Sequence, residues 1–465
     1  MSEGENITGR YAGYIKNLKF SDLPVEVVSQ AKKLILDTLG CTMGGSRTKI
    51  ALMLLDYVRS HKGARESTIV GHKAMTLCRD AAFINAQMAH ILDYDETYKM
   101  MGHPAGPTIY PAMAIGEVKK ISGRDFIVAF VLGYDIASRI AAAIWPSEER
   151  RKQVWPFGTF HVFGSVSAVS KVLSLDKNQI ENALGIAAAN APIPFTRRFV
   201  EKFCMIKNCE GWAASVGIDS ALLARRGFSG LHKVLDGNTG FWVMAGSDTC
   251  NWELMVDKLG EEFEIMKGSI KLYPIYQEVQ STLDVFHAMV REERLSVKDI
   301  KKCTIRSCSD ICGNINQDSY RISARPKTME EAWANIKWGI AMISLGIDRG
   351  PAWFTDELFN SRKVLNMMEK IKLQTDPEAD KYFPEKIVSM VEIITMKGDR
   401  YTNRVETADG VPQNPLSWDE VRQKFEELAS PVIGREKSKG VVIGVEKLER
   451  QSDIRNLTSL LRAGK

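Results

Sequence analysis

The chain contains the segment His90-Ile-Leu-Asp-Tyr-Asp-Glu-Thr-Tyr-Lys-Met-Met-Gly-His-Pro-Ala-Gly-Pro107, which holds two of its seven histidines. If residues 80–99 form one helix, His90, Asp93 and Thr97 stand at positions i, i+3 and i+7. That spacing places all three side chains on one face of the helix. The segment is therefore expected to present an imidazole, a carboxylate and a hydroxyl together.

The helix in this segment is expected to end before Pro104, because proline interrupts helical hydrogen bonding. His103 precedes this proline and is expected to be extended, at the mouth formed by the helix end. Asp95 would lie about 200° around the helix from Asp93, so these two carboxylates are not expected to form an acid pair. The same polar face could be a catalytic site or a buried polar network that only stabilises the fold.

The composition is that of a soluble globular protein with two domains. The chain has 465 residues, 45% of them apolar, and this length exceeds one ordinary core. Its 62 basic and 57 acidic residues give a net charge of +5, which is too mild to indicate nucleic acid but suits a small anionic substrate. The eight cysteines form no CxxC pair and are expected to be reduced thiols.

No secretion signal or membrane span is expected. The N-terminus is polar and acidic, unlike a signal peptide. The most apolar run, Phe126 to Tyr134, is far shorter than the roughly 20 residues that a membrane span needs. We therefore expect a cytoplasmic protein without membrane contact.

The hydrophobic spacing predicts helices first and strands later. Apolar residues recur at helical spacing through most of the first 226 residues. Strand patterns then occur at 301–309 and 387–396, the second followed by a hairpin turn at Gly398. A capping box at Ser122 and a cap at Asp176 mark two helix starts, and a capping box at Ser417 returns the chain to helix. The fold is therefore predicted to be mainly α, with an α+β unit inserted.

Three further residues stand where an anion could bind. The predicted domains are a large helical domain built from both chain ends (1–268 and 406–465) and a smaller inserted α+β domain (269–405). Lys271 falls where the chain crosses between these domains, and inter-domain clefts bind ligands. His161 falls near a helix N-terminus, which stabilises anions. Lys207 lies in an apolar-flanked stretch, where a lysine either extends to water or binds an anion.

Several motifs occur in a specific order along nearly the whole chain. They are Leu36-Asp-Thr-Leu-Gly-Cys41, His90-Ile-Leu-Asp-Tyr-Asp95 with His103-Pro104, Lys207 with Gly211-Trp-Ala-Ala214, Leu223-Ala-Arg-Arg-Gly-Phe-Ser-Gly230, Lys271-Leu-Tyr-Pro274 and Pro412-Gln-Asn-Pro415. In these motifs the chain resembles the MmgE/PrpD family, which includes 2-methylcitrate dehydratases, cis-aconitate decarboxylases and iminodisuccinate epimerases. The resemblance implies a large all-α domain with a smaller α+β lid, a homodimer with the active site between domains, and no metal or organic cofactor.

The resemblance also implies which residues form the active site. The matching positions are Asp93, Thr97, His103, His161, Lys207, Lys271 and, more loosely, Tyr320. Many relatives have a cysteine and then a histidine after the Lys271 motif, where this chain has Ile275, Tyr276 and Gln280. Lys207 is followed by Asn-Cys-Glu in place of a histidine-containing turn. These departures bear on the substrate more than on the fold.

These residue types suit proton transfer next to a carboxylate. The candidates to bind substrate carboxylates as ion pairs are Lys207, Lys271 and one of Arg197 and Arg198. Cationic groups would also stabilise the enediolate-like charge that forms when the proton leaves. His103 and His161 would share the roles of base and acid, because the imidazole pKa lies near working pH. Asp93 would orient or charge one histidine, and Thr97 would hydrogen-bond the substrate or Asp93.

Three functions are compatible with this reasoning. The first is a cofactor-independent hydro-lyase that acts on 2-methylcitrate or a similar hydroxy-tricarboxylate. The second is an epimerase of an imino- or amino-dicarboxylate, or a decarboxylase, which keeps the proton transfer without losing water. The third is a non-catalytic helical dimer that binds a carboxylate or a partner protein. Walker A, dinucleotide-binding, zinc-protease and serine-hydrolase motifs do not occur in the sequence.

Overall fold

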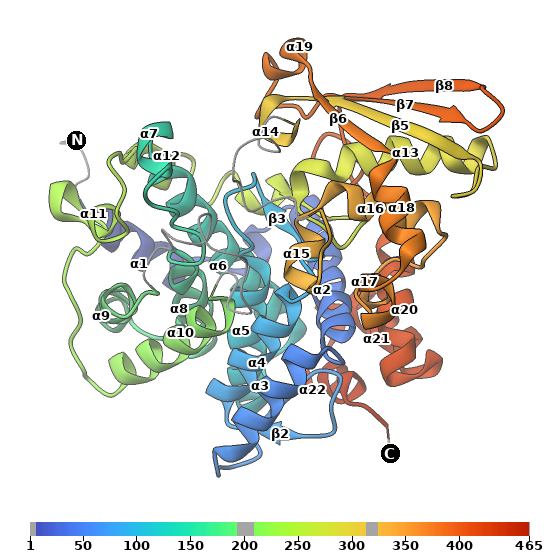
Figure 1. The fold of residues 1–465 in the computed structure, drawn as a ribbon. Helices are drawn as coiled ribbons and strands as arrows, with labels where there is room; N and C mark the ends of the chain where they lie inside the picture. The colour runs from blue at the N-terminus through green and yellow to red at the C-terminus, as the bar shows by residue number, and fades with distance from the viewer. Residues whose placement is uncertain (1–5, 193–208, 313–323, 465) are drawn as a thin grey trace.

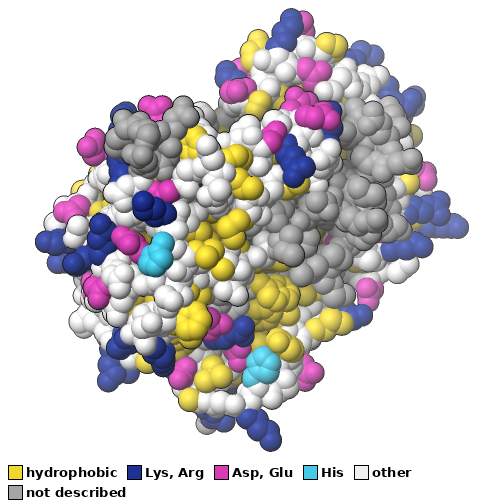
Figure 2. Space-filling model, turned by 90° about the vertical axis from the view of Figure 1, so that its left-hand side faces the viewer, with side chains coloured by type: hydrophobic (Ala, Val, Ile, Leu, Met, Phe, Trp, Pro, Cys, Tyr) yellow, Lys and Arg dark blue, Asp and Glu magenta, His cyan; other side chains and the backbone are white. Residues whose placement is uncertain are grey.

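The computed structural model describes residues 6–192, 209–312 and 324–464, and this part is mostly helical, as the sequence predicts (Figure 1). Figure 2 shows basic and acidic side chains interspersed over one face of the molecule, without a large patch of one sign. That distribution agrees with the mild net charge of +5.

The helical part consists of long helices that pack side by side. Its longer helices before residue 226 are α1 (Ile7–Asn17), α2 (Val25–Gly45), α3 (Lys49–Ser60), α4 (Cys78–His90), α5 (Ala105–Lys119), α6 (Gly123–Ala143), α8 (His161–Val172), α9 (Lys177–Ala189) and α10 (Glu210–Arg225). The predicted caps are confirmed: Ser122 and Asp125 form a capping box at the start of α6, and the Asp176 side chain caps α9. Helix α8 lies among α5, α6 and α10.

The longer helix α6 contains the apolar run Phe126 to Tyr134. It has 21 residues and is long and apolar enough to cross a membrane by length and composition. However, 94% of its most apolar window is buried inside the protein, because other helices pack around it. Helix α6 is therefore a core helix, and it is apolar on all sides because every side contacts other helices.

The C-terminal segment is helical and packs on helices from the first part of the chain. Helix α20 (Trp418–Ile433) begins at the expected capping box of Ser417, and α21 (Arg435–Glu446) follows it. Helix α20 packs so closely on α2 that a Cβ added to Gly40 would lie 3.2 Å from Cα of Phe425. One hydrophobic core therefore contains apolar residues from both ends of the chain.

The region predicted to be the α+β unit contains a four-stranded sheet in the order β6-β5-β7-β8. Its strands are β5 (Ile300–Ser307), β6 (Ile371–Thr375), β7 (Ser389–Thr395) and β8 (Arg400–Val405). Strands β5 and β6 are parallel, and the other neighbouring pairs are antiparallel. The β7–β8 hairpin contains the expected Gly398, whose φ of 96° is easily adopted only by glycine. Strand β6 is an addition to the prediction, because its five residues are too few for a pattern to stand out.

Helices lie against the sheet on the side of the helical part (Figure 1). Of these, α13 (Gln280–Glu292) and α18 (Arg362–Glu369) contact the strands. Helix α16 (Ile336–Ser344), which follows α15 (Met329–Trp333), packs on both of them. Helices α15 and α16 are separate because Asn335 caps a new helix by accepting from the N–H of Lys337 and Trp338. The apolar residues of this region form a second core. Its boundaries and its movement as a lid remain predictions.

Candidate active site

Helix α4 ends at His90, so the single helix predicted for residues 80–99 is wrong. The chain turns at once: the N–H of Asp93 donates to the carbonyl of His90 at 3.0 Å, and Asp93 has a left-handed φ of 50°. Strand β3 (Thr97–Tyr98) follows and pairs with β4 (Gly268–Ser269). The polar side chains of the segment therefore meet through a folded loop and not along one helix face.

Two buried lysines hold this loop. Nζ of Lys271 donates to Oδ1 of Asp93 at 2.6 Å and to its carbonyl oxygen at 2.9 Å. Nζ of Lys424, from α20, donates to the carbonyl oxygen of Tyr94 at 2.8 Å and lies 2.6 Å from Oδ1 of Asp37. Each lysine thus satisfies a loop carbonyl that lacks a helical partner. Asp93 and Lys271, which the sequence selected separately, are in direct contact.

Lys424 and Asp37 form a second buried ion pair. Burial raises the pKa of the Asp37 carboxyl, although the Lys424 ammonium acts to lower it. Burial alone would lower the pKa of Lys424, but the neighbouring Asp37 carboxylate outweighs it and raises that pKa above its ordinary value. Helix α20 therefore contributes a buried cation to the loop from the far end of the chain.

Asp95 lies between two imidazole rings. Both of its carboxylate oxygens are 3.0 Å from Nδ1 of His90, and Oδ2 is 3.6 Å from Nδ1 of His103. Nδ1 of His103 also donates to the carbonyl oxygen of Glu96 at 2.6 Å. Because a carbonyl oxygen only accepts, this contact puts the proton of neutral His103 on Nδ1 and the lone pair on Nε2. The carboxylate beside the histidines is therefore Asp95, whereas Asp93 belongs to the lysine contact.

His161 begins α8, as predicted, and is fully buried. Its Nδ1 donates to Oε2 of Glu210 at 2.6 Å, and its Nε2 accepts the backbone N–H of His103 at 3.2 Å. Only glycine fits before His103, since a Cβ added to Gly102 would lie 2.8 Å from Nε2 of His161. The two predicted histidines are thus adjacent, and His161 holds the backbone of His103. Their shared acid–base role remains a prediction.

The loop between β3 and α5 carries two more polar groups. Thr97 donates from Oγ1 to the carbonyl of Gly102 at 3.2 Å, so its hydroxyl fixes the turn that leads to His103. Glu96 is buried and accepts the backbone N–H of Ala105 at the start of α5. Burial, together with the charge of Asp95, raises the pKa of Glu96 well above its ordinary value. Glu96 therefore adds a carboxyl group that resists ionisation.

The described site residues chosen from sequence lie together in this region. They are Asp93, Thr97, His103, His161 and Lys271. Lys207, Arg197, Arg198 and Tyr320 lie outside the described residues. Sequence reasoning missed Asp95, Glu96, Glu210 and Lys424. Asp95 and Glu96 had a local signal, since they stand inside the histidine-containing segment. However, in the helix assumed for residues 80–99 their side chains would point away from the face that carries His90.

Three of these residues have spacing that suits a metal ion. His90, Asp95 and His103 offer ligand atoms that all lie within 4.8 Å of one another. However, the 2.6 Å contact between Nδ1 of His103 and the carbonyl oxygen of Glu96 requires a proton on that nitrogen, and a metal would displace it. We therefore assign hydrogen bonds, and not metal coordination, to these residues.

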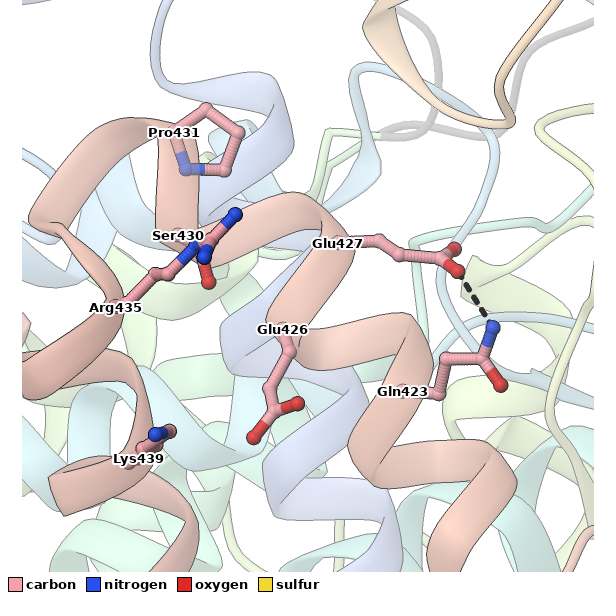
Figure 3. A pocket seen from close by; sticks show the side chains of 7 residues that line it. All are labelled: Gln423, Glu426, Glu427, Ser430, Pro431, Arg435 and Lys439. Atoms are coloured by element: carbon pink, nitrogen blue, oxygen red, sulfur yellow. Dashed lines mark hydrogen bonds between the residues drawn. The ribbon is translucent and has the colours of Figure 1, made fainter.

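Hollows outside this cluster include one between α20 and α21 and one beside β3. Figure 3 shows the first, between α20 and α21, where polar side chains of both charges line the surface and Gln423 donates to Glu427 at 2.8 Å. The second is a cavity of about 730 Å³, lined by residues 99–101 beside β3 and by residues 384–387 and 406–413. Of these two, the second adjoins the site, because its 99–101 wall belongs to the turn that leads to His103.

Two domain models of one family match nearly the whole chain. Residues 9–252 match the MmgE/PrpD N-terminal domain, and residues 273–450 match the MmgE/PrpD C-terminal domain. The chain belongs to the MmgE/PrpD family. This membership confirms the resemblance drawn from the sequence, and the C-terminal match includes α20 and α21 as well as the sheet.

Proteins similar to this MmgE/PrpD member include several named for one reaction. The cis-aconitate decarboxylase of Mus musculus is 26% identical over 472 residues, which cover 98% of this chain and 94% of that protein. That of Homo sapiens is 25% identical over 476 residues, covering 98% and 95%. The cis-aconitate decarboxylase-like protein oryM of Aspergillus oryzae is 25% identical over 486 residues, covering 98% and 97%.

Proposed function

We propose that this protein is a lyase that acts on a tricarboxylate by transferring a proton at a carbon near a carboxylate. The observation that carries the proposal is the setting of His103, whose Nδ1–H is held by the carbonyl of Glu96 beside Asp95. An imidazole whose Nδ1–H is fixed offers Nε2 for a single, directed proton transfer. The relatives named cis-aconitate decarboxylase support a tricarboxylate as the substrate.

Lys271 is the group that we propose to bind a substrate carboxylate. An ammonium has three N–H donors, and two contacts of Lys271 go to Asp93. The third donor would bind the substrate as a charge-assisted hydrogen bond. Because this lysine is buried, such a contact would be stronger than the same contact in water.

Decarboxylation of cis-aconitate is the reaction to test first. The bond from the methylene carbon to its carboxylate would break, release CO₂, and leave its electron pair as a new C=C bond. The electrons of the original double bond would take a proton from Nε2 of protonated His103. His103 would then regain a proton from water, so the reaction consumes one proton overall and needs no oxidant.

Dehydration of 2-methylcitrate, which the sequence favours, is the second candidate. It requires a base for the proton and an acid for the leaving hydroxyl. The contact between Nε2 of His161 and the backbone N–H of His103 supports it, because it places a second histidine next to His103. An epimerase would need the proton transfer alone.

Proton NMR in deuterated buffer separates these reactions. The purified protein is incubated with cis-aconitate, 2-methylcitrate, citrate and an aspartate-derived imine. Release of CO₂ with a deuterated alkene product supports decarboxylation, an alkene formed from a hydroxy-tricarboxylate supports dehydration, and deuterium uptake alone supports epimerisation. If none of the four compounds changes, the proposal is overturned in favour of a non-catalytic dimer that binds carboxylates.

Two histidine variants serve as a matched pair. His103→Ala should abolish turnover of whichever substrate reacts, because the proton-transfer group is removed. His232→Ala changes an exposed histidine and should leave turnover unchanged. Equal turnover by both variants would contradict the assignment of His103. Light scattering of the wild-type protein tests the proposed homodimer.

A further inference from the structure

Behind His103 lies a buried pair that the proposed reaction does not use directly. His90 and Asp95 are both buried, and the carboxylate accepts from Nδ1 of His90 at 3.0 Å. The rings of His90 and His103 have centroids 4.3 Å apart. His90 thus fixes the Asp95 carboxylate at 3.6 Å from Nδ1 of His103.

We propose that Asp95, held by His90, is a positioning residue that sets the tautomer of His103 and stabilises its protonated form. In the neutral state, the carbonyl of Glu96 and the carboxylate of Asp95 both favour the proton on Nδ1 of His103. When Nε2 also carries a proton, the ring is an imidazolium, and a carboxylate at this distance stabilises it. The proposal deepens the proposed function and rests on it for its kinetic test alone.

The other charged groups of the site have partners other than the ring of His103. Lys271 contacts Asp93, and Lys424 from α20 contacts Asp37. From α8, His161 faces the backbone of His103, and its own partner on α10 is Glu210.

The remaining acid beside His103 is Glu96, on the same loop. Burial and the neighbouring charge of Asp95 favour its protonated form, so its side chain supplies little negative charge. Among the described residues, Asp95 is therefore the carboxylate that acts on the ring of His103. His90 from α4 is the group that holds this carboxylate in place.

The substitution Asp95→Asn tests this inference, because it removes the charge and keeps the shape. Without the carboxylate the His103 imidazolium is less stable. In the pH profile of kcat/KM, the limb that reports the ionisation of His103 should therefore move to lower pH by about one unit or more. This direction is the same whether the acid or the base form of His103 is active. The plateau of kcat/KM should fall by about 100-fold or more, as when a carboxylate behind a catalytic histidine is lost. An unmoved limb would overturn the proposal.

The control is Asp135→Asn on α6. Asp135 is a buried carboxylate paired with Arg139 at 2.9 Å and has no contact with the histidines. This variant should lower the melting temperature without moving the pH limb. A purely structural role for Asp95 would give the same result as Asp135→Asn.

A second measurement needs no substrate. Nitrogen-15 NMR of the protein labelled in histidine reports the protonation of each ring, and His103→Gln assigns the signal of His103. We expect the Nδ1–H tautomer in the wild type and a titration at lower pH in Asp95→Asn. The same titration in both proteins would overturn the proposal, even if no tricarboxylate is turned over and the proposed function fails.

If Asp95→Asn does not fold, His90 carries the test. His90→Gln keeps an N–H donor toward Asp95, whereas His90→Leu removes it. The structure predicts that the tautomer and titration of His103 are altered more in His90→Leu than in His90→Gln. Equal spectra for the two variants would count against a positioning role for this pair.

Discussion

Nζ of Lys271 lies 2.6 Å from the carboxylate and 2.9 Å from the carbonyl oxygen of Asp93, so one buried ammonium holds both the side chain and the backbone of the same residue. Asp93 is left-handed, with a φ of 50°. Such a conformation persists in a residue other than glycine only where surrounding contacts enforce it. The contact therefore ties the inserted region to the loop that carries the histidines.

Loss of this lysine should destabilise the protein strongly. Lys271→Met removes the buried ammonium from the carboxylate of Asp93, and breaking a buried ion pair in this way costs about 3–5 kcal/mol of unfolding free energy. The double variant Lys271→Met/Asp93→Asn should recover part of this loss, because the negative charge that Lys271 offsets is removed together with the lysine. Urea denaturation followed by tryptophan fluorescence measures both.

An exposed ion pair provides the control for Lys271. Nζ of Lys258 lies 2.5 Å from Glu262 on the surface, and Lys258→Met should change the unfolding free energy little. The changes in unfolding free energy caused by Lys271→Met and Asp93→Asn should not add up in the double variant. Simple additivity would show that the two residues are not energetically coupled.

Replacing His161 should mainly lower stability, whereas replacing His103 should mainly abolish turnover. His161→Leu removes the donor to Glu210 and the acceptor for the N–H of His103, so it should lower stability by about 1–3 kcal/mol. His103→Gln should abolish turnover with a smaller loss of stability, because its ring is nearer the surface. Thermal unfolding and kcat measured on the same samples compare them. A larger loss of stability in His103→Gln would contradict this division.

The fold was largely predictable because its signals are local. Three helices begin at capping residues that the sequence marks within three positions. These residues are Ser122, Asp176 and Ser417, and the structure confirms all three caps. The extent of α4 was not predictable in this way. Its end at His90 depends on a turn whose carbonyls are satisfied by a lysine 330 residues away in sequence, Lys424 on Tyr94.

The same reason explains the missed site residues. Glu210 is 49 residues from His161, and no spacing rule connects them. Asp95 was set aside because a straight helix would have turned it away from the other polar groups. Once the helix ends at His90, that geometric argument fails, and Asp95 reaches both imidazoles. The types of residue in the site were therefore predictable, whereas their pairing was not.

Activity should not depend on a bound metal. His103 uses Nδ1–H for the carbonyl of Glu96, which a metal at the His90–Asp95–His103 cluster would displace. Dialysis against EDTA should leave kcat/KM for the active tricarboxylate unchanged. Added Zn²⁺ should inhibit, if it acts at all, because it would compete for the nitrogen that holds the proton. A loss of activity with EDTA that returns with one added metal would reverse the assignment.

Asp284 on α13 should make the stability of the protein depend on pH. Burial raises the pKa of its carboxyl to about 8, although the backbone N–H of Asp409 donates to it at 2.9 Å. The folded protein thus keeps this proton up to about pH 8, whereas an unfolded aspartate loses it near pH 4. Between these values unfolding releases a proton, so the unfolding free energy of the wild type falls as pH rises.

Asp284→Asn removes this dependence while it keeps the shape of the protonated side chain. The variant should therefore gain stability relative to the wild type as pH rises from 5 to 7.5, as measured by urea denaturation at several pH values. Asp299→Asn is the control, because hydrogen bonds from Ser296 lower the pKa of Asp299 and its contribution is already complete above about pH 4. A stability difference for Asp284→Asn that stays constant across this range would show that Asp284 ionises in the folded protein as it does in the unfolded chain.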